Sequence, residues 1–401
     1  MNVIFKMLLL LGFFLCIAAV FSEENARLLK VFIYTRHGAR SPYTAFPKDN
    51  ASWYCDEVTA DSVAYTSKGT KQAIGKGFLH LYDKSNVLPG TCYQGQLTSV
   101  GLAEQHLLGI KYRHKYIHAL RFAPEDFDPS FVHLRSTDIT RTRQSLASQL
   151  LGWYEKSISY KGIHPVINIQ EKETDPLADQ SWCTAFSSEQ KRIQSANLDL
   201  IAVHSDRLRE LQDILGYEGD KGDDEYDLWY TIWDNLITRT WLGISLPQGV
   251  TYADVVTGNN VADILTSLLY CNEDPSVSMF MKQARIGPYI TELINLITTK
   301  EGPGSERLHI TACHDTTIMP LMATFAGSQW DCNWPPYASH IELEIWEHDS
   351  EKYVRLYYMG KRVLPVGCTD SRICLLNDFI NKIREVSVPF DSWNDVCVTK
   401  K

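Results

Sequence analysis

This 401-residue chain lacks several signatures of common catalytic and nucleotide-binding sites. No cysteine has an arginine six positions later, which excludes the Cys-x5-Arg loop that thiol-dependent phosphate chemistry requires. HExxH, a P-loop glycine-lysine signature and GxGxxG are also missing. The 12 histidines are scattered, and none pairs with cysteines at zinc-like spacing. We therefore expect no metal and no cofactor.

Long apolar runs are confined to the amino terminus. After Lys6, residues 7–21 form an apolar run of 15 residues, which suits a signal-peptide core and is short for a membrane span of about 20 residues. We predict a signal peptide over residues 1–22 and a mature chain from Glu23, with an uncleaved anchor as the alternative. No later apolar run reaches about 18 residues. We expect no stable membrane anchor and a location that is secreted or in the lysosomal or endomembrane lumen.

An excess of positive charge is lacking as well. The net charge is −9, or −10 once Lys6 leaves with the signal peptide. An acidic chain with a few clustered arginines argues against nucleic acid and against a polybasic membrane surface as partners. It suits a small anion that reaches a local positive pocket. About 379 mature residues (401 less 22) are enough to bury a large core.

The ten cysteines indicate an oxidising compartment. Cys16 lies in the signal peptide, and Cys313 follows an apolar run that favours a buried, inert thiol. If Cys313 is free, eight cysteines remain for up to four disulfides. Cys368 and Cys374 bracket a short loop and are the first expected pair. Asn50 begins the only glycosylation sequon, in a polar loop.

The most informative stretch is Arg36-His37-Gly38-Ala39-Arg40-Ser41-Pro42, directly after a strand-like run at residues 28–35. Arginine forks bind a phosphate dianion bidentately and stay charged at any working pH. A histidine between two arginines can attack the phosphorus that they hold. A basic surface turn is the alternative reading of this motif.

Two further segments end in charged residues where a strand is expected to end. Residues 131–135 read as a strand that ends at Arg135, followed by Ser136-Thr137-Asp138 as an N-cap cluster for a helix at residues 139–154. Residues 308–313 read as a third strand, followed by His314 and Asp315. Ligands of open α/β sheets bind at the carboxyl ends of strands, so all these groups can converge on one phosphate. Taken singly, Arg135 can be a cation of the helix N-terminal turn, and His314 and Asp315 a hydrogen-bonded pair.

Four motifs in this order resemble those of the histidine acid phosphatase family: RHGARSP, GQLTSVG at residues 95–101, RSTD at residues 135–138 and HDTT at residues 314–317. This family is the larger branch of the histidine phosphatase superfamily and contains the prostatic and lysosomal acid phosphatases. The resemblance runs from about Leu28 to Cys374. It implies that His37 is the nucleophile and Asp315 the general acid. It assigns phosphate binding to Arg36, Arg40, Arg135 and His314.

The resemblance also bears on the disulfides. It implies that Cys183 pairs with Cys397. The cysteines then left are Cys55, Cys92, Cys271 and Cys332. Pairing Cys55 with Cys92 and Cys271 with Cys332 is our prediction, although sequence alone does not fix the connectivity.

The chemistry of these residues agrees with the resemblance. Arginines neutralise and orient a phosphate monoester, whose oxygens otherwise repel a nucleophile. The same positive field favours the uncharged imidazole of His37, which has a free lone pair. Attack gives a phosphohistidine and an alkoxide, which Asp315 protonates if it carries a proton, as low pH favours. Water then hydrolyses the phosphohistidine with the same carboxylate as base, and no metal is required.

We predict an α/β fold with a central, mostly parallel sheet, helices on both faces and an inserted, smaller α-helical cap domain. The core comprises residues 23–179 and 272–401. Strand signals fade over the cap, residues 180–271, where residues 188–215 and 226–242 have helical periodicity. Elsewhere we expect helices at residues 65–82, 102–120 and 375–386, and an antiparallel hairpin at the sheet edge over residues 341–357. Four tryptophans of the cap are core residues or a wall that grips the leaving group: Trp182, Trp229, Trp233 and Trp241.

These features favour a secreted or lysosomal acid phosphatase acting through a phosphohistidine. The alternatives are a phytase-like inositol phosphate phosphatase and a non-catalytic, secreted phospho-ligand-binding protein on the same fold. Because a binder needs only the arginines, the presence of His37 and Asp315 favours catalysis. The expected substrates are small-molecule phosphate monoesters, with phosphoproteins and phospholipids as further candidates. A homodimer is compatible with the sequence.

Overall fold

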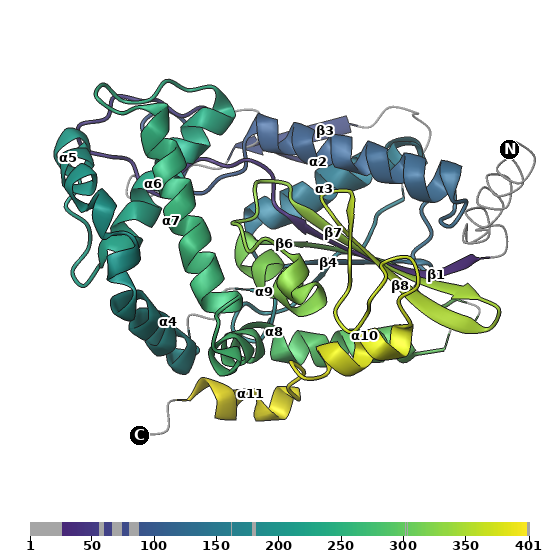
Figure 1. Ribbon diagram of the computed structural model, residues 1–401. Helices are drawn as coiled ribbons and strands as arrows, with labels where there is room; N and C mark the ends of the chain where they lie inside the picture. The colour runs from purple at the N-terminus through teal and green to yellow at the C-terminus, as the bar shows by residue number, and fades with distance from the viewer. Residues whose placement is uncertain are drawn as a thin grey trace, which may run out of the picture.

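The computed structural model describes residues 26–55, 60–65, 74–79, 88–161, 163–178, 182–300, 302 and 304–398. Its central feature is a seven-stranded sheet with the strand order β5-β4-β6-β1-β7-β8-β9 (Figure 1). The strands are β1 (Arg27–Arg36), β4 (Val132–Ser136), β5 (Asn168–Ile169), β6 (Leu308–Cys313), β7 (His340–His348), β8 (Glu351–Tyr358) and β9 (Lys361–Val363). The three strands predicted at residues 28–35, 131–135 and 308–313 are thus confirmed.

The sheet is mixed, which corrects the prediction of a mostly parallel sheet. Strand β6 pairs in parallel with β1 and β4, and β4 with β5. The other three pairings, β1–β7, β7–β8 and β8–β9, are antiparallel. A turn at Asp349 and Ser350 joins β7 to β8, and so short a connection permits only antiparallel pairing. The predicted hairpin is confirmed and supplies this half of the sheet.

Helices cover both faces of the sheet, as predicted, because side chains of β1 alternate between two apolar clusters. Val31 and Ile33 pack with α2 (Ser99–Tyr112) and α3 (Thr140–Glu155). Phe32 and Tyr34 pack with α8 (Pro275–Thr298), α9 (Asp315–Phe325) and α10 (Leu376–Ile383). Burial on both faces explains the nearly continuous apolar sequence of β1.

Residues 182–270 form helices that gather at one end of the sheet, at the left of Figure 1. They are α4 (Thr184–Ala196), α5 (Ser205–Leu215), α6 (Glu225–Leu242) and α7 (Tyr252–Tyr270), with two 3-10 turns at residues 198–200 and 202–204. Their buried side chains, such as Trp229 and Leu265, belong to the same apolar cluster as Phe32. The terminal helix α11 (Phe390–Cys397) packs against α4 and α8.

Short helical segments and a small hairpin lie outside these layers. The π-helical segments η3 (Arg113–Ala119) and η4 (Lys156–Tyr160) extend α2 and α3, and η7 (Gly327–Gln329) follows α9. Strands β2 (Ala60–Tyr65) and β3 (Ile74–Leu79) form an antiparallel hairpin, so the helix predicted at residues 65–82 is wrong there. Two glycines within β3 lower the helix propensity of that segment. The remainder of that predicted helix and the predicted signal peptide lie outside the described residues.

The disulfides are those predicted: Cys55–Cys92, Cys183–Cys397, Cys271–Cys332 and Cys368–Cys374. Cys313 is free and buried, as predicted. Asn50 is exposed in a loop. None of the helices in the described part of the chain is long and apolar enough to cross a membrane.

Candidate active site

The loop after β1 is held tightly between β6 and α2. The His37 amide donates to the Cys313 carbonyl at 3.0 Å, and the Gly38 amide donates to Ser145 Oγ at 3.1 Å. A Cβ atom on Gly38 would lie 2.2 Å from the carbonyl oxygen of Gly101, in the first turn of α2. Only glycine therefore fits at position 38, and the loop places His37 at the carboxyl end of β1.

One ring nitrogen of His37 is fixed and the other is left for chemistry. Nδ1 lies 2.9 Å from the carbonyl oxygen of Gly38, which can only accept, so Nδ1 carries the proton. Nε2 of the neutral ring then holds the lone pair. Burial, followed by the positive charges of Arg141 and Arg36, lowers the pKa of His37 well below its usual value. His37 is therefore an uncharged imidazole whose Nε2 can act as a nucleophile.

The two arginines of the motif are buried and anchored differently. Arg36 donates to the Pro335 carbonyl at 2.6 Å and stacks on the Tyr337 ring at 4.4 Å. Arg40 forms a bidentate pair with Asp234 of α6, at 2.6 and 3.2 Å. Burial opposes the charge of Arg40, but the Asp234 carboxylate outweighs it and raises its pKa. The sequence analysis missed Asp234, whose partner lies 194 residues away in the chain.

His314 and Asp315 lie where β6 leads into α9. Nδ1 of His314 accepts from Arg141 at 3.4 Å, and its Nε2 contacts Thr137 Oγ1 at 2.9 Å. Asp315 Oδ2 lies 2.6 Å from Nη2 of Arg36, and Asp315 Oδ1 accepts from the Thr316 amide. Burial favours the neutral carboxyl, but the charges of Arg36 and Arg40 outweigh it and lower the pKa of Asp315. Without a bound anion, Asp315 is therefore a carboxylate.

Arg135 does not join this group, contrary to its predicted place. Its guanidinium donates to Asp175 at 2.8 Å, to Gln170 at 2.9 Å and to Glu292 at 3.0 Å, and stacks on Tyr289. These partners satisfy a buried cation, and Arg135 does not line the cavity that His37 lines. Arg135 lies near the carboxyl end of β4, as predicted, but its side chain belongs to a separate ion-pair network.

Arg141, and not Arg135, lies beside His37 and His314 at the carboxyl ends of the strands. It lies in the first turn of α3, contacts His314 and Tyr43, and has a buried Nε without a hydrogen-bond partner. Among the described residues, no carboxylate forms an ion pair with it. Burial and the neighbouring Arg40 lower its pKa. The sequence contained a signal for Arg141, because a residue in the first turn of a helix that follows a strand faces the same edge of the sheet as the end of that strand.

These groups surround one cavity of about 420 Å³. It is lined by His37, Arg40, Tyr43, Ile139, Arg141, Lys172, Tyr230, His314, Asp315 and Thr316. The structure thus brings together His37, Asp315, Arg40 and His314 of the predicted set, with Arg36 paired to Asp315 behind them. The cavity combines the neutral imidazole of His37, the carboxylate of Asp315, two guanidiniums and the ammonium group of Lys172, a set that suits a phosphate ester.

Two further cavities adjoin the first one. An aromatic compartment of about 60 Å³ shares Tyr230 and Asp315 with it and is walled by Trp233, Trp241 and Trp334. A more apolar cavity of about 210 Å³ shares Tyr230 and Thr316 with the first cavity. Its apolar lining includes Phe186, Leu265, Leu269, Tyr270 and Met319. Of the four tryptophans of the predicted cap, Trp233 and Trp241 line the aromatic compartment, Trp229 is in the core, and Trp182 packs on Trp393.

Comparison with known families agrees with the motifs and the site. The family model of the histidine phosphatase superfamily (branch 2) matches residues 27–359. The chain belongs to this family. The resemblance inferred from the four motifs is thereby confirmed, and with it the enzyme class, a phosphoric monoester hydrolase.

Several relatives of this histidine phosphatase are named as phosphatases. Human lysophosphatidic acid phosphatase type 6 is 27% identical over 386 residues, covering 92% of this chain and 86% of the relative. The lysosomal acid phosphatase of Xenopus laevis is 25% identical, covering 96% and 82%. The phytase of Citrobacter braakii superposes with a TM-score of 0.62 at 16% identity, covering 93% of this chain and all of that one. This last likeness concerns the fold.

Proposed function

We propose that this protein is an acid phosphatase that hydrolyses phosphate monoesters through a phosphohistidine on His37. The observation that carries the proposal is the Nδ1–H contact of His37 to the Gly38 carbonyl, which leaves Nε2 unprotonated beside buried guanidiniums. Arg36, Arg40, Arg141 and His314 bind the phosphoryl group, and Asp234 positions Arg40. Arginines replace the metal cation that other phosphatases use to neutralise the phosphoryl oxygens.

Bond making and breaking follow from this arrangement. Nε2 of His37 attacks the phosphorus as the ester P–O bond breaks on the opposite side. Asp315, in its protonated form, gives its proton to the departing alkoxide. Water then attacks the phosphohistidine, the carboxylate of Asp315 takes a proton from that water, and phosphate and neutral His37 are regenerated.

The proton on Asp315 depends on the bound phosphoryl group. In the free protein the arginines lower the pKa of Asp315. A bound phosphate cancels part of that positive field, so the pKa of Asp315 rises in the complex. A phosphate monoester has its second pKa near 6, so at lower pH it arrives as a monoanion that carries one proton into the site. An acidic working range follows.

The adjoining cavities favour a substrate with an apolar leaving group. The 210 Å³ cavity is lined mainly by aliphatic and aromatic side chains and opens beside Thr316 and Tyr230 of the phosphate cavity. An acyl chain gains about 0.8 kcal/mol for each methylene that it buries there. We therefore favour a lysophosphatidic-acid-like phospholipid, in line with the name of the relative that is 27% identical. A phytase-like role is less favoured, because an inositol polyphosphate needs several cations, and this cavity offers one, Arg285, among mostly aliphatic and aromatic side chains.

The remaining features fit a protein of an oxidising lumen, either secreted or lysosomal. Four disulfides support this location. Cleavage of residues 1–22 and glycosylation of Asn50 belong to the same proposal. So does the division into a core of residues 23–179 and 272–401 and a helical cap of residues 180–271. The cap contributes Asp234 and, of the aromatic wall, Trp233 and Trp241.

The decisive experiment compares His37→Ala with His118→Ala, a control at a half-exposed histidine of η3. With p-nitrophenyl phosphate at pH 5, His37→Ala should lose turnover and His118→Ala should keep it. Acid-labile, base-stable phosphate should be trapped on His37 of the unmodified enzyme. Activity retained by His37→Ala would exclude the covalent route. A wild type that binds phosphate without turnover would instead identify a binding protein.

The leaving-group assignment has its own test. The ratio kcat/KM should rise with acyl chain length in lysophosphatidic acids, and phytate should be a poor substrate. Leu265→Trp, which fills the apolar cavity, should abolish the chain-length dependence and spare p-nitrophenyl phosphate. Leu200→Trp, at an exposed position, is the matched control. Equal kcat/KM for all chain lengths in the wild type would exclude an acyl-chain site.

A further inference from the structure

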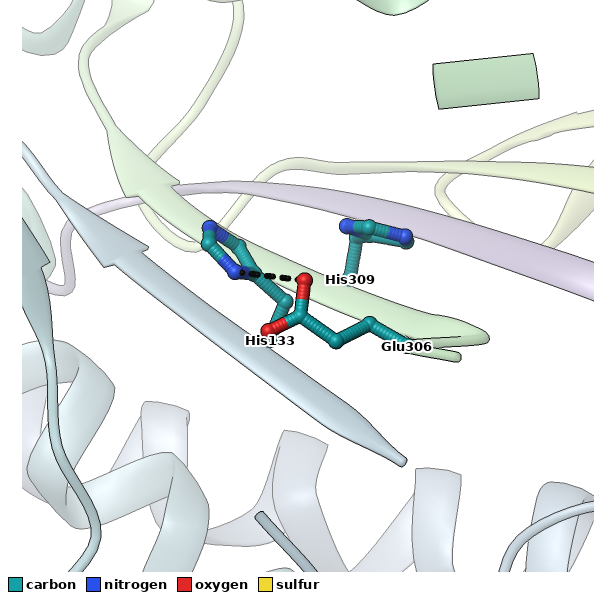
Figure 2. A group of neighbouring side chains, drawn as sticks. All are labelled: His133, Glu306 and His309. Carbon is teal, nitrogen blue, oxygen red and sulfur yellow. Dashed lines mark ion pairs between the residues drawn. The ribbon is translucent and has the colours of Figure 1, made fainter. Parts of the chain in front are cut away.

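A second cluster of potential ligand atoms lies away from the phosphate cavity. It consists of His133 in β4, His309 in β6 and Glu306 just before β6 (Figure 2). His133 and His309 are paired positions of adjacent parallel strands, so their side chains share one face of the sheet. Nδ1 of His133 lies 3.0 Å from Oε2 of Glu306. The three ligand atoms lie within 4.8 Å of one another.

The cluster is separate from the catalytic groups. His309 precedes Cys313, the last residue of β6, by four residues. At 3.3 Å per residue this places it about 13 Å toward the amino-terminal end of the strand. Neither the proposed mechanism nor the phosphate cavity involves any member of the cluster.

We propose that His133, Glu306 and His309 bind a divalent transition-metal ion, with Zn²⁺ as the expected ion. Two imidazoles and one carboxylate form a recognised zinc ligand set, in which water completes the tetrahedron. The side chains of His133 and Glu306 are 29% and 43% exposed, so water and the ion can reach them. At Zn–N and Zn–O distances of about 2.0–2.2 Å, the ligand atoms must converge by about 1 Å. Rotation of the two exposed side chains supplies this movement.

His309 is the preorganised ligand of the site. It is buried, and its ring stacks on Phe32 with centroids 4.6 Å apart and an interplanar angle of 13°. It also hydrogen-bonds the backbone of Glu306. Metal-bound histidines commonly donate their second ring N–H to a carbonyl, which fixes the ring and its tautomer. The ring is thus already oriented by the protein.

One nearby charge opposes metal binding. Burial is the main cause of the lowered pKa of His309, and the positive charge of Lys30 contributes to it. The ammonium group of Lys30 donates to the carbonyls of Leu296 and Thr299 at the carboxyl end of α8, at 2.6 and 2.7 Å. The negative end of the helix dipole there offsets part of its repulsion of a dication. Because the remaining charge of Lys30 repels a dication, Lys30→Met should tighten the binding of Zn²⁺.

The test is a zinc titration of the full-length secreted protein after treatment with a chelator, at pH 7.5 and monitored by calorimetry. Excess sulfate is present, so that an anion occupies the phosphate cavity. We expect one equivalent of zinc to bind at the cluster and the Tm to rise by about 2–5 °C. His133→Gln and Glu306→Gln should each weaken binding by more than the roughly 10- to 100-fold that loss of an outer-shell partner costs. Both positions are partly exposed, so these variants should fold.

A matched control is the double variant His114→Gln/His118→Gln. These two histidines of η3 have ring centroids 6.5 Å apart and form a candidate surface chelate. The control should keep the zinc equivalent. Loss of binding in the control, or its retention in both His133→Gln and Glu306→Gln, would overturn the proposal. Absence of zinc binding to the wild type would do the same, and neither result would affect the proposed phosphatase function.

Discussion

The guanidinium of Arg36 and the carboxylate of Asp315 form a buried ion pair, with Nη2 and Oδ2 2.6 Å apart. The side chains are 6% and 10% exposed, so the pair is shielded from solvent. The proposed mechanism assigns the same guanidinium to the arriving phosphoryl group. In this mechanism anion binding takes a counterion from Asp315 and raises its pKa, which couples substrate binding to protonation of the proposed general acid.

The first prediction concerns this coupling. Sulfate carries no proton of its own near pH 5, so any proton taken up on its binding comes to rest on the protein. Because the pKa of Asp315 is low in the free protein and rises in the complex, sulfate should bind more tightly as the pH falls. Calorimetry in buffers of different ionisation enthalpy should detect the uptake. His37 and His314 can also take up protons when sulfate binds. The variant Asp315→Asn should take up fewer protons than the wild type, and the difference gives the contribution of Asp315. An unchanged uptake would place the proton elsewhere.

The second prediction separates ester classes. Asp315→Asn keeps the size of the side chain but removes its acidic proton. Turnover of alkyl phosphates, whose alkoxides need protonation, should fall by roughly 100- to 10,000-fold. Aryl phosphates with acidic phenols should lose much less, because they depart unaided. Equal losses in both classes, with phosphohistidine formation rate-limiting, would show that Asp315 is not the leaving-group acid.

The third prediction distinguishes two arginines. Arg141→Ala should weaken all substrates and inorganic phosphate alike, with kcat/KM lower by roughly 100- to 1,000-fold, the usual cost of one transition-state donor. Arg135→Ala should instead lower the free energy of unfolding by about 3–5 kcal/mol, since it breaks a buried pair with Asp175. Inhibition constants for phosphate and denaturant titrations give the two readouts. A folded Arg135→Ala protein with a specific loss of phosphate affinity would show that Arg135 binds the phosphoryl group.

The contrast between these arginines shows what the sequence could reveal. The strands β1, β4 and β6 were predictable because their buried sequences are short and mostly apolar, and each directs its carboxyl end to the same edge of the sheet. His37 follows the end of β1 directly, and Asp315 lies two residues after the end of β6. The choice between Arg135 and Arg141 depends on the turn between β4 and α3. Helix α3 begins at Thr140 after the N-cap residue Ile139, and it lacks the side-chain cap predicted at residues 136–138. Asp234 comes from a distant helix, and only tertiary packing places it against Arg40.

The fourth prediction concerns Cys313. Burial raises its pKa to about 12, so at neutral pH it is a protonated thiol with no access to reagents. Iodoacetamide should leave it unmodified in the native protein and alkylate it after unfolding without reductant. Peptide mapping should then find the other eight mature cysteines in disulfides. Alkylation of Cys313 in the folded protein would show that the carboxyl end of β6 is open to solvent.

The last prediction concerns the loop after β1 that carries His37 and its contact with the first turn of α2. Gly38→Ala puts a methyl group 2.2 Å from the Gly101 carbonyl oxygen, so the loop or the first turn of α2 must move. A displacement of about 1 Å at reacting groups can cost 100-fold in rate, and kcat should fall by at least that factor. Gly302→Ala is the matched control, because a Cβ atom there would have nothing within 4 Å and its φ is not in the left-handed region. Both variants stiffen the unfolded chain equally, so a difference in kcat or Tm reports the contact alone. Full activity of Gly38→Ala would mean that the close approach to Gly101 does not position His37.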